Sequence, residues 1–425
     1  ALITGIGQIV FTSIVGFLIA LAFGFSPIVA VYIAVALTFS STIIIVKLLA
    51  EKKHLNSLYG KISLGFLLVQ DFVAVIILMV LAGTKSDSVS LFDIITLLIK
   101  ASILFYAVWY LSKDILPKLF SRIVGQSQEL LFVVSIAWAL GVATLVGGPL
   151  GFSFEIGGFL AGLALSNVPE HIGIASKTKS LRDFFLVLFF ISLGGQLAID
   201  NVLSILPMAS VFSIFVLIGN PLIVMFILGL LGYKSRTSFL ASVTVAQVSE
   251  FSFILMSMGQ SLGHTTSADT ALVVLVGAIT MTGSTYLILG SEKIFRKLKV
   301  FLKHFERRIT KESAYEVEMD LSDHVVLIGC DKIGSLILPY FLKRGVPTVV
   351  VDYNPSVFNT LSSSNVNVIL GDIVDGDIQD KIKLEKAKVV ICTIPNLEEN
   401  LSILERLNKS KDVLFIGSAE NRFDS

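Results

Sequence analysis

The order of apolar and polar residues divides the chain into two parts. From residue 1 to about residue 290, apolar stretches recur at about the 20-residue length that an α-helix needs to cross a bilayer. We predict ten membrane spans, at residues 1–23, 28–50, 58–82, 91–111, 129–147, 151–166, 183–198, 203–232, 237–259 and 269–290. Beyond residue 290 charged residues become frequent, which indicates a domain outside the bilayer.

The second part shows the pattern of an α/β domain. Short strands are predicted at residues 325–328, 348–352, 366–370, 389–393 and 413–417. Helices are predicted between them, the first ending near residue 344 and the others at residues 355–363, 377–383 and 397–409. This alternation predicts a doubly wound, Rossmann-like parallel sheet. We therefore expect a membrane domain at 1–290, a linker at 291–322 and a Rossmann-like domain at 323–425.

The charges between the predicted spans agree with this count. Basic residues fall in every second connection, at Lys52, Lys53, Lys113, Lys118, Arg122, Lys177, Lys179, Arg182, Lys234 and Arg236, and again after the last span. The alternate connections hold only Lys85 and no arginine. By the positive-inside rule the first set is cytoplasmic, and so is the Rossmann-like domain.

Composition supports the membrane assignment and excludes other classes. Hydrophobic residues make up 54% of the chain and charged residues 15%, which a water-soluble globular chain would not tolerate. The net charge of +1 gives no indication of a nucleic-acid partner. Cys330 and Cys392 are expected to be buried thiols, and the scattered histidines predict no metal site. Because the chain opens inside an apolar segment without Met, we expect a fragment of a longer membrane domain.

The linker begins with a basic run and ends with an acidic one. Basic residues are frequent from Lys293 to Lys311, and acidic residues follow from Glu312 to Asp323. A solvated helix next to the membrane is the simpler interpretation. Attraction to anionic lipid headgroups is the alternative.

Asp71 is the first functional candidate. It stands in the middle of the third span beside Gln70, and a carboxylate at that depth costs about 2.5–3.5 kcal/mol on insertion scales. Such a group can hold a proton when neutral or a dehydrated cation when ionised, which indicates ion or proton handling. A structural carboxylate paired with a neighbouring helix is the alternative.

Polar residues interrupt two other spans. The second span contains Thr38, Ser40, Ser41 and Thr42, and the ninth contains Gln247, Ser249 and Glu250. Hydroxyls alone can bond to their own helix without further effect. Two polar interruptions in different halves of a membrane domain are, however, typical of discontinuous helices that cross at a midplane ion site. In the eighth span, Pro221 is expected to break the helix after Asn220, whose amide can donate and accept.

The Rossmann-like domain carries part of a dinucleotide fingerprint. Gly329 and Gly334 flank a turn that includes Asp331, Lys332 and Ile333. Asp352 follows the next strand, where dinucleotide-binding domains carry the acid that binds the ribose hydroxyls. Gly371 and Asp372 follow the third strand.

The acid at the middle of this turn argues against a pyrophosphate. Asp331 occupies the position of the middle glycine, where its charge would repel one, so AMP fits better than NAD(H). A nucleotide-free domain that serves dimerisation is the alternative. No hydride-transfer acid or base is recognisable, and we predict no enzymatic activity.

Five motifs together carry a resemblance to a known family. They lie at residues 39–42, 68–71, 157–162, 188–194 and 247–251. In order and spacing they resemble the Kef-type branch of the second cation:proton antiporter family, whose members carry a cytoplasmic RCK/KTN (TrkA-N-like) nucleotide-binding domain. The resemblance covers the whole chain.

The resemblance implies a fold and a set of roles. It implies an inverted-repeat antiporter fold of thirteen spans with two broken crossing helices, so that about three N-terminal spans would be absent from this chain, and it implies a homodimer. We also expect a regulatory subunit as a further partner and a Rossmann-like domain that is truncated at its C-terminal end. Asp71 would be the site where cation and proton compete, with Gln70 in place of a second aspartate. Thr38 to Thr42 would form the first broken helix, and Gln247, Ser249 and Glu250 would belong to the second.

One residue departs from the family pattern. Asn220 stands where many relatives carry a basic side chain, which leaves the charge stoichiometry open.

The expected activity is K⁺/H⁺ exchange by alternating access in the inner or plasma membrane, regulated by AMP or NAD(H).

Three alternatives remain from the sequence. Na⁺/H⁺ exchange would use the same fold. A ligand-gated K⁺ efflux channel should carry a filter resembling Thr-Val-Gly-Tyr-Gly, and none is present. A nucleotide sensor that uses the membrane part as an anchor would leave Asp71 and Glu250 without a role.

Overall fold

A computed structural model describes the chain except for short segments. The residues outside the description are 53, 56, 84–90, 121–126, 151, 153, 196–198, 303–304, 307–320, 365, 375, 396, 409–412 and 420–425. Most of the acidic end of the predicted linker therefore lies outside the described residues. The chain forms two compact units: residues 1–42, 66–223 and 244–286 make the first, and residues 43–65, 224–243 and 287–425 make the second.

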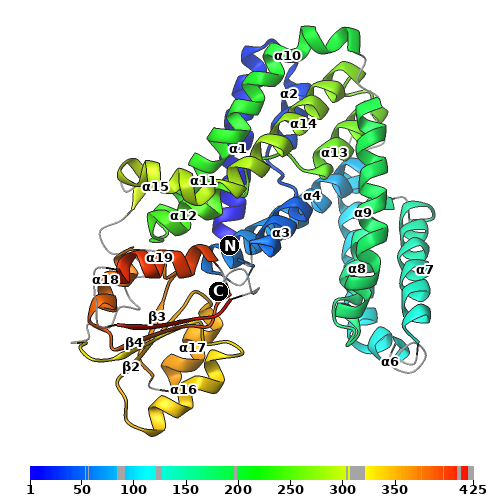
Figure 1. The fold of residues 1–425 in the computed structure, drawn as a ribbon. Helices are drawn as coiled ribbons and strands as arrows, with labels where there is room; N and C mark the ends of the chain where they lie inside the picture. The colour runs from blue at the N-terminus through cyan, green and yellow to red at the C-terminus, as the bar shows by residue number, and fades with distance from the viewer. Residues whose placement is uncertain are drawn as a thin grey trace. The chain divides into compact units, whose positions relative to one another are not determined.

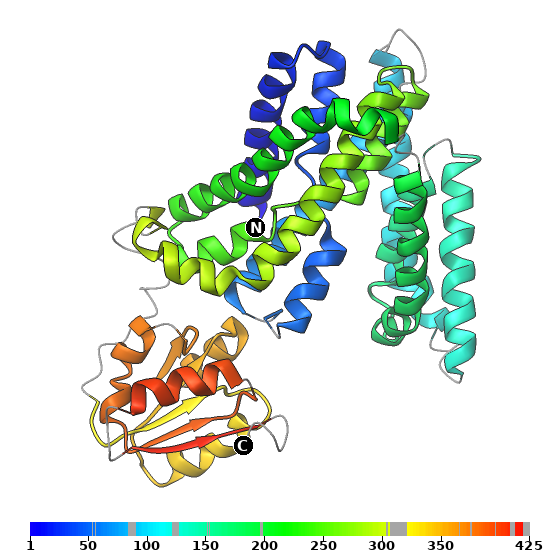
Figure 2. The ribbon, with the colours of Figure 1, turned by 45° about the horizontal axis from the view of Figure 1, so that its top comes forward.

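Helices account for the predicted membrane part (Figure 1). In chain order they are α1 (Leu2–Ala22), α2 (Pro27–Ala36), α3 (Thr42–Glu51), α4 (Leu58–Gly83), α5 (Leu91–Tyr110), α6 (Leu116–Leu119), α7 (Gln128–Gly147), α8 (Phe154–Leu165), α9 (His171–Gly195), α10 (Ile199–Ile214), α11 (Asn220–Leu230), α12 (Ser235–Val243), α13 (Glu250–Ser261), α14 (Ser267–Leu289) and α15 (Ser291–Leu302). Within the first unit, α1 packs beside α2 and α7 beside α8, as Figures 1 and 2 both show.

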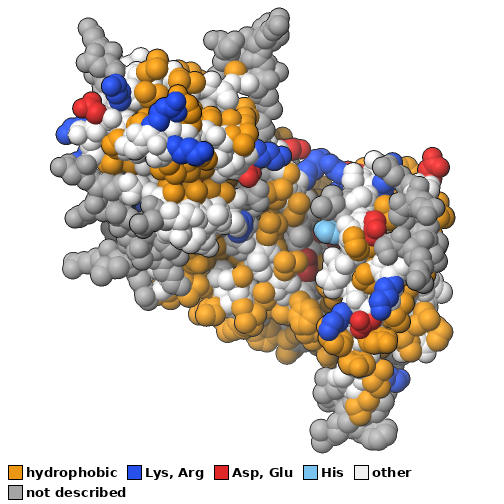
Figure 3. Space-filling model, turned by 90° about the horizontal axis from the view of Figure 1, so that it is seen from below, with side chains coloured by type: hydrophobic (Ala, Val, Ile, Leu, Met, Phe, Trp, Pro, Cys, Tyr) orange, Lys and Arg blue, Asp and Glu red, His pale blue; other side chains and the backbone are white. Residues whose placement is uncertain are grey.

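Among the described residues, five helices are long and apolar enough to cross a membrane. They lie at Leu2–Ala22, Leu58–Leu81, Glu129–Gly147, Leu203–Leu230 and Ser267–Leu289. The remaining predicted spans correspond to helices that are interrupted, short, only partly described or placed differently. Many large apolar side chains on these helices are exposed, and Figure 3 shows hydrophobic side chains over broad areas of one face. Such surfaces fit contact with lipid rather than water.

Helix α9 begins at His171, ahead of the span predicted from residue 183, and its first turns carry Lys177, Lys179 and Arg182, which an apolar pattern does not include. One detail of the predicted spans was wrong. The proline in the eighth span was predicted to break the helix. Instead, a π-helical turn (Phe215–Gly219) joins α10 directly to α11, and such a turn accommodates the lost backbone hydrogen bond.

The Rossmann-like domain lies in the second unit. Its strands are β1 (Val325–Ile328), β2 (Thr348–Asp352), β3 (Val368–Leu370), β4 (Val389–Cys392) and β5 (Leu414–Gly417). They form one sheet in the order β3-β2-β1-β4-β5, and all four pairings are parallel. The predicted parallel α/β sheet is therefore confirmed.

Helices cover both faces of this sheet, as the doubly wound pattern requires. Helices α16 (Gly334–Lys343) and α17 (Pro355–Ser363) pack on one face, where Leu338 and Phe358 join a core with Leu327. Helices α18 (Gly376–Lys381) and α19 (Leu397–Leu407) pack on the other (Figure 1). Cys330 and Cys392 are free, buried thiols, as predicted, and burial raises the pKa of the Cys330 thiol to about 11.

Candidate functional site

Two pairs of helices are separated by short non-helical segments that contact each other. Residues 37–41 separate α2 from α3, and residues 244–249 separate α12 from α13. The Gln247 side-chain amide donates to the Ser41 carbonyl oxygen at 3.2 Å, and the Ser40 hydroxyl donates to a carbonyl oxygen of the second segment, also at 3.2 Å. Backbone groups that leave a helix inside a membrane need partners, and the two segments supply them to each other.

Each intramembrane carboxylate is bonded at the first turn of a helix that follows an interruption, Asp71 from the middle of α4 and Glu250 as the first residue of α13. The Thr42 hydroxyl, on the first residue of α3, donates to Asp71 Oδ2 at 2.9 Å. Glu250 is the first residue of α13, and its carboxylate accepts the Ser41 hydroxyl at 2.8 Å and the Ser249 hydroxyl at 3.3 Å. The positive end of a helix dipole stabilises negative charge at such positions. The geometry therefore suits ionised carboxylates, whose oxygens are the ligand type that alkali cations take.

A chain of buried amides lies behind the carboxylates. Gln70 accepts the Ser40 backbone N–H at 3.3 Å and donates to Gln8 Oε1 at 2.6 Å. Gln8 in turn donates to the Thr38 carbonyl oxygen at 3.1 Å. These side chains are fully buried, whereas Asp71 is only partly buried. Gln70 thus holds the first interruption in place and does not itself present a charge.

Asn220 belongs to the same network at its far end. Its Nδ2 donates to the Leu37 carbonyl oxygen at 3.1 Å, and its Oδ1 accepts the Thr12 hydroxyl at 3.0 Å. Leu37 is the C-cap residue that follows α2, so Asn220 satisfies a carbonyl at the helix end. The ten predicted ion-site residues thus fall into three hydrogen-bonded groups, which meet at the consecutive residues Ser40, Ser41 and Thr42, and Asn220 is placed on the helix end rather than on Asp71. Their roles stay predictions.

Sequence reasoning missed three members of these groups. Gln8 and Thr12 on α1 bond to each other at 3.2 Å, and Ser284 on α14 donates to Gln247 Oε1 at 2.8 Å. Gln8 and Thr12 are four residues apart on the buried side of the first span, which also carries Thr4. This polar stripe at helical spacing was visible in the sequence and marks α1 as a partner of the site.

The glycine turn of the Rossmann-like domain has the predicted backbone. Gly329 adopts φ +79°, a conformation that favours glycine. A Cβ on Gly334, the first residue of α16, would lie 2.0 Å from the Gly329 carbonyl oxygen, so only glycine fits. The Thr393 hydroxyl donates to the same carbonyl at 2.8 Å. The turn therefore brings backbone close to the start of α16, as phosphate-binding turns do.

Asp352 lies at this turn. Its Oδ2 accepts the Cys330 backbone N–H and its Oδ1 accepts the Asn354 N–H, each at 2.8 Å. Burial raises the pKa of the Asp352 carboxyl, although these two N–H groups act in the opposite direction. Residues 331–333 are exposed, so the Asp331 side chain does not fill the turn.

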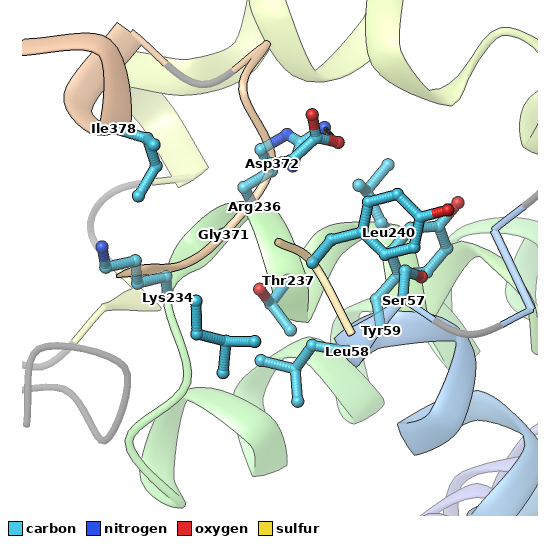
Figure 4. Close-up of a pocket in the computed structure, with 12 residues that line it drawn as sticks. Ser57, Leu58, Tyr59, Lys234, Arg236, Thr237, Leu240, Gly371, Asp372 and Ile378 are labelled. Carbon is cyan, nitrogen blue, oxygen red and sulfur yellow. Dashed lines mark hydrogen bonds and ion pairs between the residues drawn. The ribbon is translucent and has the colours of Figure 1, made fainter. Parts of the chain in front are cut away.

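Asp372, which the sequence assigned to nucleotide binding, is held by an arginine of α12. Arg236 Nη2 lies 2.8 Å from Asp372 Oδ2 and 2.9 Å from Glu292 Oε1, and Figure 4 shows Arg236 beside Asp372. Burial raises the pKa of the Asp372 carboxyl, but the Arg236 charge and the Val374 N–H outweigh it and hold that pKa below its usual range. Gly371 and Asp372 line a small cavity of about 40 Å³ at this contact.

Taken together, the fold and the site define an integral membrane protein with a polar centre between interrupted helices and a Rossmann-like domain of nucleotide-binding type. The sequence profile of the sodium/hydrogen exchanger transmembrane family matches residues 1–289, and that of the TrkA-N domain matches residues 325–422. The chain therefore belongs to the sodium/hydrogen exchanger family. The resemblance to Kef-type antiporters with an RCK domain is confirmed.

Individual relatives agree with this family. The chain is 29% identical to the "Putative cation/proton antiporter YbaL" of Escherichia coli (strain K12), over 97% of this chain and 76% of that protein. It is 26% identical to K(+) efflux antiporter 3, chloroplastic, of Arabidopsis thaliana, over 89% of this chain and 50% of that protein. A crystal structure of the TrkA-N domain of E. coli inner membrane protein ybaL matches at 29% identity, with a TM-score of 0.24, over 25% of this chain and 79% of that one.

Proposed function

We propose that the protein is a secondary active antiporter that exchanges a monovalent cation for protons by alternating access at Asp71. The observation that carries the proposal is the position of the Asp71 carboxylate, which accepts the Thr42 hydroxyl where α3 begins after an interruption. A carboxylate within a membrane span costs free energy, so a chain carries one there mainly when it handles ions or protons. Here it contacts a hydroxyl oxygen, and oxygen is the ligand type that alkali cations take.

The exchange follows from competition at one group. With the Asp71 carboxylate ionised, a dehydrated cation binds to it and to neighbouring oxygens such as that of Thr42. Protonation removes the charge and releases the cation. Because the site is then occupied by either a proton or a cation, a conformational change that exposes it to the other side couples the two fluxes.

The neutral groups around Asp71 favour electroneutral exchange. Gln70 and Asn220 are fully buried amides engaged with backbone groups, at Ser40 and Leu37 respectively. Neither adds a charge to the site, whose second carboxylate, that of Glu250, is bonded to the Ser41 and Ser249 hydroxyls and takes no part in the proposed exchange. One carboxylate that trades one proton for one monovalent cation moves no net charge, so we propose one-for-one exchange.

The names of the relatives favour K⁺ over Na⁺ as the cation. The relative from Arabidopsis thaliana is a K(+) efflux antiporter, whereas the one from E. coli carries the broader description of a cation/proton antiporter. Both ions take oxygen ligands, so the residues at the site do not by themselves choose between them. The homodimer and a regulatory subunit stay predictions.

The Rossmann-like domain supplies the regulation in this proposal. A nucleotide at the Gly329 to Gly334 turn would place phosphate at the start of α16 and ribose near Asp352. The Asp331 side chain is exposed and does not fill the turn, but its negative charge would repel a pyrophosphate, which favours AMP over NAD(H). Next to that turn, Lys61 of α4 donates to Asn354 Oδ1 at 2.7 Å.

Two membrane helices contact the Rossmann-like domain at the ends of its strands, α4 through Lys61 and Asn354 and α12 through Arg236 and Asp372. Lys61 belongs to α4, the helix of Asp71, and Arg236 belongs to α12, which leads into the second interruption. A nucleotide that altered the loops after β2 and β3 would act on both helices.

Transport by the protein in proteoliposomes tests the proposal. Vesicles that contain a pH-sensitive dye are given an outward K⁺, Na⁺ or choline gradient. We expect internal pH to change with the K⁺ gradient, less with the Na⁺ gradient and not with choline. Cation flux that proceeds without proton movement would contradict exchange and favour a channel.

A further inference from the structure

Helix α15 begins two residues after the last membrane-spanning helix and has three distinct sides. α14 ends at Leu289, and α15 begins at Ser291. One side of α15 is buried in the protein: the Phe295 ring lies 5.9 Å from the Phe239 ring of α12, centroid to centroid, and Leu302 is 3% exposed. The helix is therefore fixed to α12 along this side.

A second side of α15 is apolar and largely exposed, although the Phe301 ring also contacts the Phe305 ring. Ile294, Leu298 and Phe301 are spaced by four and three residues, so they share one face of the helix. Leu298 is 43% exposed and Phe301 is 60% exposed. In water, apolar side chains of this size at consecutive turns would be unfavourable. The same apolar side chains would be stable in the acyl region of a bilayer, just below the headgroups.

The third side of α15 is basic. Lys293, Arg296, Lys297 and Lys299 are all exposed, whereas Glu292, the only acidic residue of the helix, turns to Arg236. Long basic side chains can reach a headgroup while their methylene stems cover apolar surface. A helix with an exposed apolar strip beside a cationic strip, directly after a membrane span, matches the chemistry of an anionic bilayer surface.

We propose that α15 lies in the cytoplasmic membrane interface, with its apolar strip among acyl chains and its basic strip against anionic lipid headgroups. A helix surrounded by water would explain the exposed basic side chains but not the exposed apolar side chains of Leu298 and Phe301. The proposal does not depend on which ion the protein transports. Because α15 packs on α12, anionic lipid would also hold α12 in place.

Hydrogen exchange of the protein in nanodiscs tests the proposal. The amide exchange of residues 291–302 is compared in phosphatidylcholine alone and in phosphatidylcholine mixed with phosphatidylglycerol. We expect at least about tenfold slower exchange in the mixture, since each basic side chain near an anionic surface contributes about fivefold to binding. High salt should remove most of that difference.

Matched variants separate the contribution of the basic side chains to lipid binding from that of the apolar side chains. The pair Arg296→Gln and Lys297→Gln should abolish the lipid dependence, whereas Lys177→Gln and Lys179→Gln, at two exposed lysines of α9, should leave it unchanged. Leu298→Ser should raise exchange in both membranes. Equal exchange of the unaltered protein in the two lipid mixtures would overturn the proposal, whether the helix were solvated in both or covered by protein in both.

Discussion

The contact between Arg236 and Asp372 offers the sharpest structural prediction. Arg236→Gln removes the guanidinium that lies within 2.9 Å of Glu292 and within 2.8 Å of Asp372. The Arg236 and Asp372 side chains are only 15% and 13% exposed, so the variant leaves carboxylates with little access to water. Removing one partner of a buried pair costs about 3–5 kcal/mol. Because some exposure remains, we expect about 3 kcal/mol here.

A double-mutant cycle read by native-state hydrogen exchange measures this coupling. Arg236→Gln, Asp372→Asn and the double variant are compared through the free energy of opening at residues 235–239 and 371–374. Since Asp372→Asn removes one of the two carboxylates that Arg236 binds, the double variant should lose less than the sum of the single losses, by about 1–3 kcal/mol.

The chain supplies its own control. Arg182 pairs with Asp183 at 2.9 Å, but these side chains are 47% and 50% exposed. Arg182→Gln should therefore cost no more than about 1 kcal/mol. The reasoning would be refuted if Arg236→Gln behaved like Arg182→Gln, or if the single losses were additive.

Further predictions concern the turn, pH, charge and the amide chain. Gly334→Ala should unfold the glycine turn, because its Cβ would lie 2.0 Å from the Gly329 carbonyl oxygen; nucleotide titration by calorimetry should then show no binding. The pKa of Asp372 is lowered in the folded protein, so its contact stabilises above the ordinary carboxyl pKa of about 3.9 and is lost only as the pH falls below it; opening measured between roughly pH 5 and 8 should not change. Exchange should not respond to a valinomycin-imposed membrane potential, whereas Gln70→Asp, which adds an acid directly next to Asp71, should make it respond. Gln8→Leu removes a hydrogen-bond partner from three buried groups, the Thr12 hydroxyl, the Thr38 carbonyl and the Gln70 amide, so it should cost about 1–3 kcal/mol in thermal unfolding; wild-type stability would contradict the role of the amide chain.

The sequence predicted the elements better than their ends. The five strands and their alternation with helices followed from local periodicity, because a parallel sheet buried on both faces needs continuous apolar runs. The start of α9 at His171 was missed since its first turns are polar and exposed. The π-helical turn before Pro221 was missed because it depends on how neighbouring helices hold the backbone, which no local pattern records.

The candidate site was predictable as a set of residue types but not as a network. Costly polar residues within apolar spans marked Asp71, Glu250 and their hydroxyl neighbours. Which partner each one binds depends on contacts between distant parts of the chain, 29 positions apart for Thr42 and Asp71 and 209 for Ser41 and Glu250. Asp372 shows the same limit: its place after a strand suggested a nucleotide, and only the fold brought Arg236 beside it.

Proton movement driven by K⁺ in proteoliposomes of the Asp71→Asn variant tests the central claim most directly. Asn keeps the size of the side chain and can still accept the Thr42 hydroxyl, but it can neither ionise nor hold a proton for exchange. Asp183→Asn, at an exposed carboxylate of α9, serves as the matched control. We predict that Asp71→Asn abolishes exchange and that Asp183→Asn retains it. Exchange at the wild-type rate in Asp71→Asn would contradict the account.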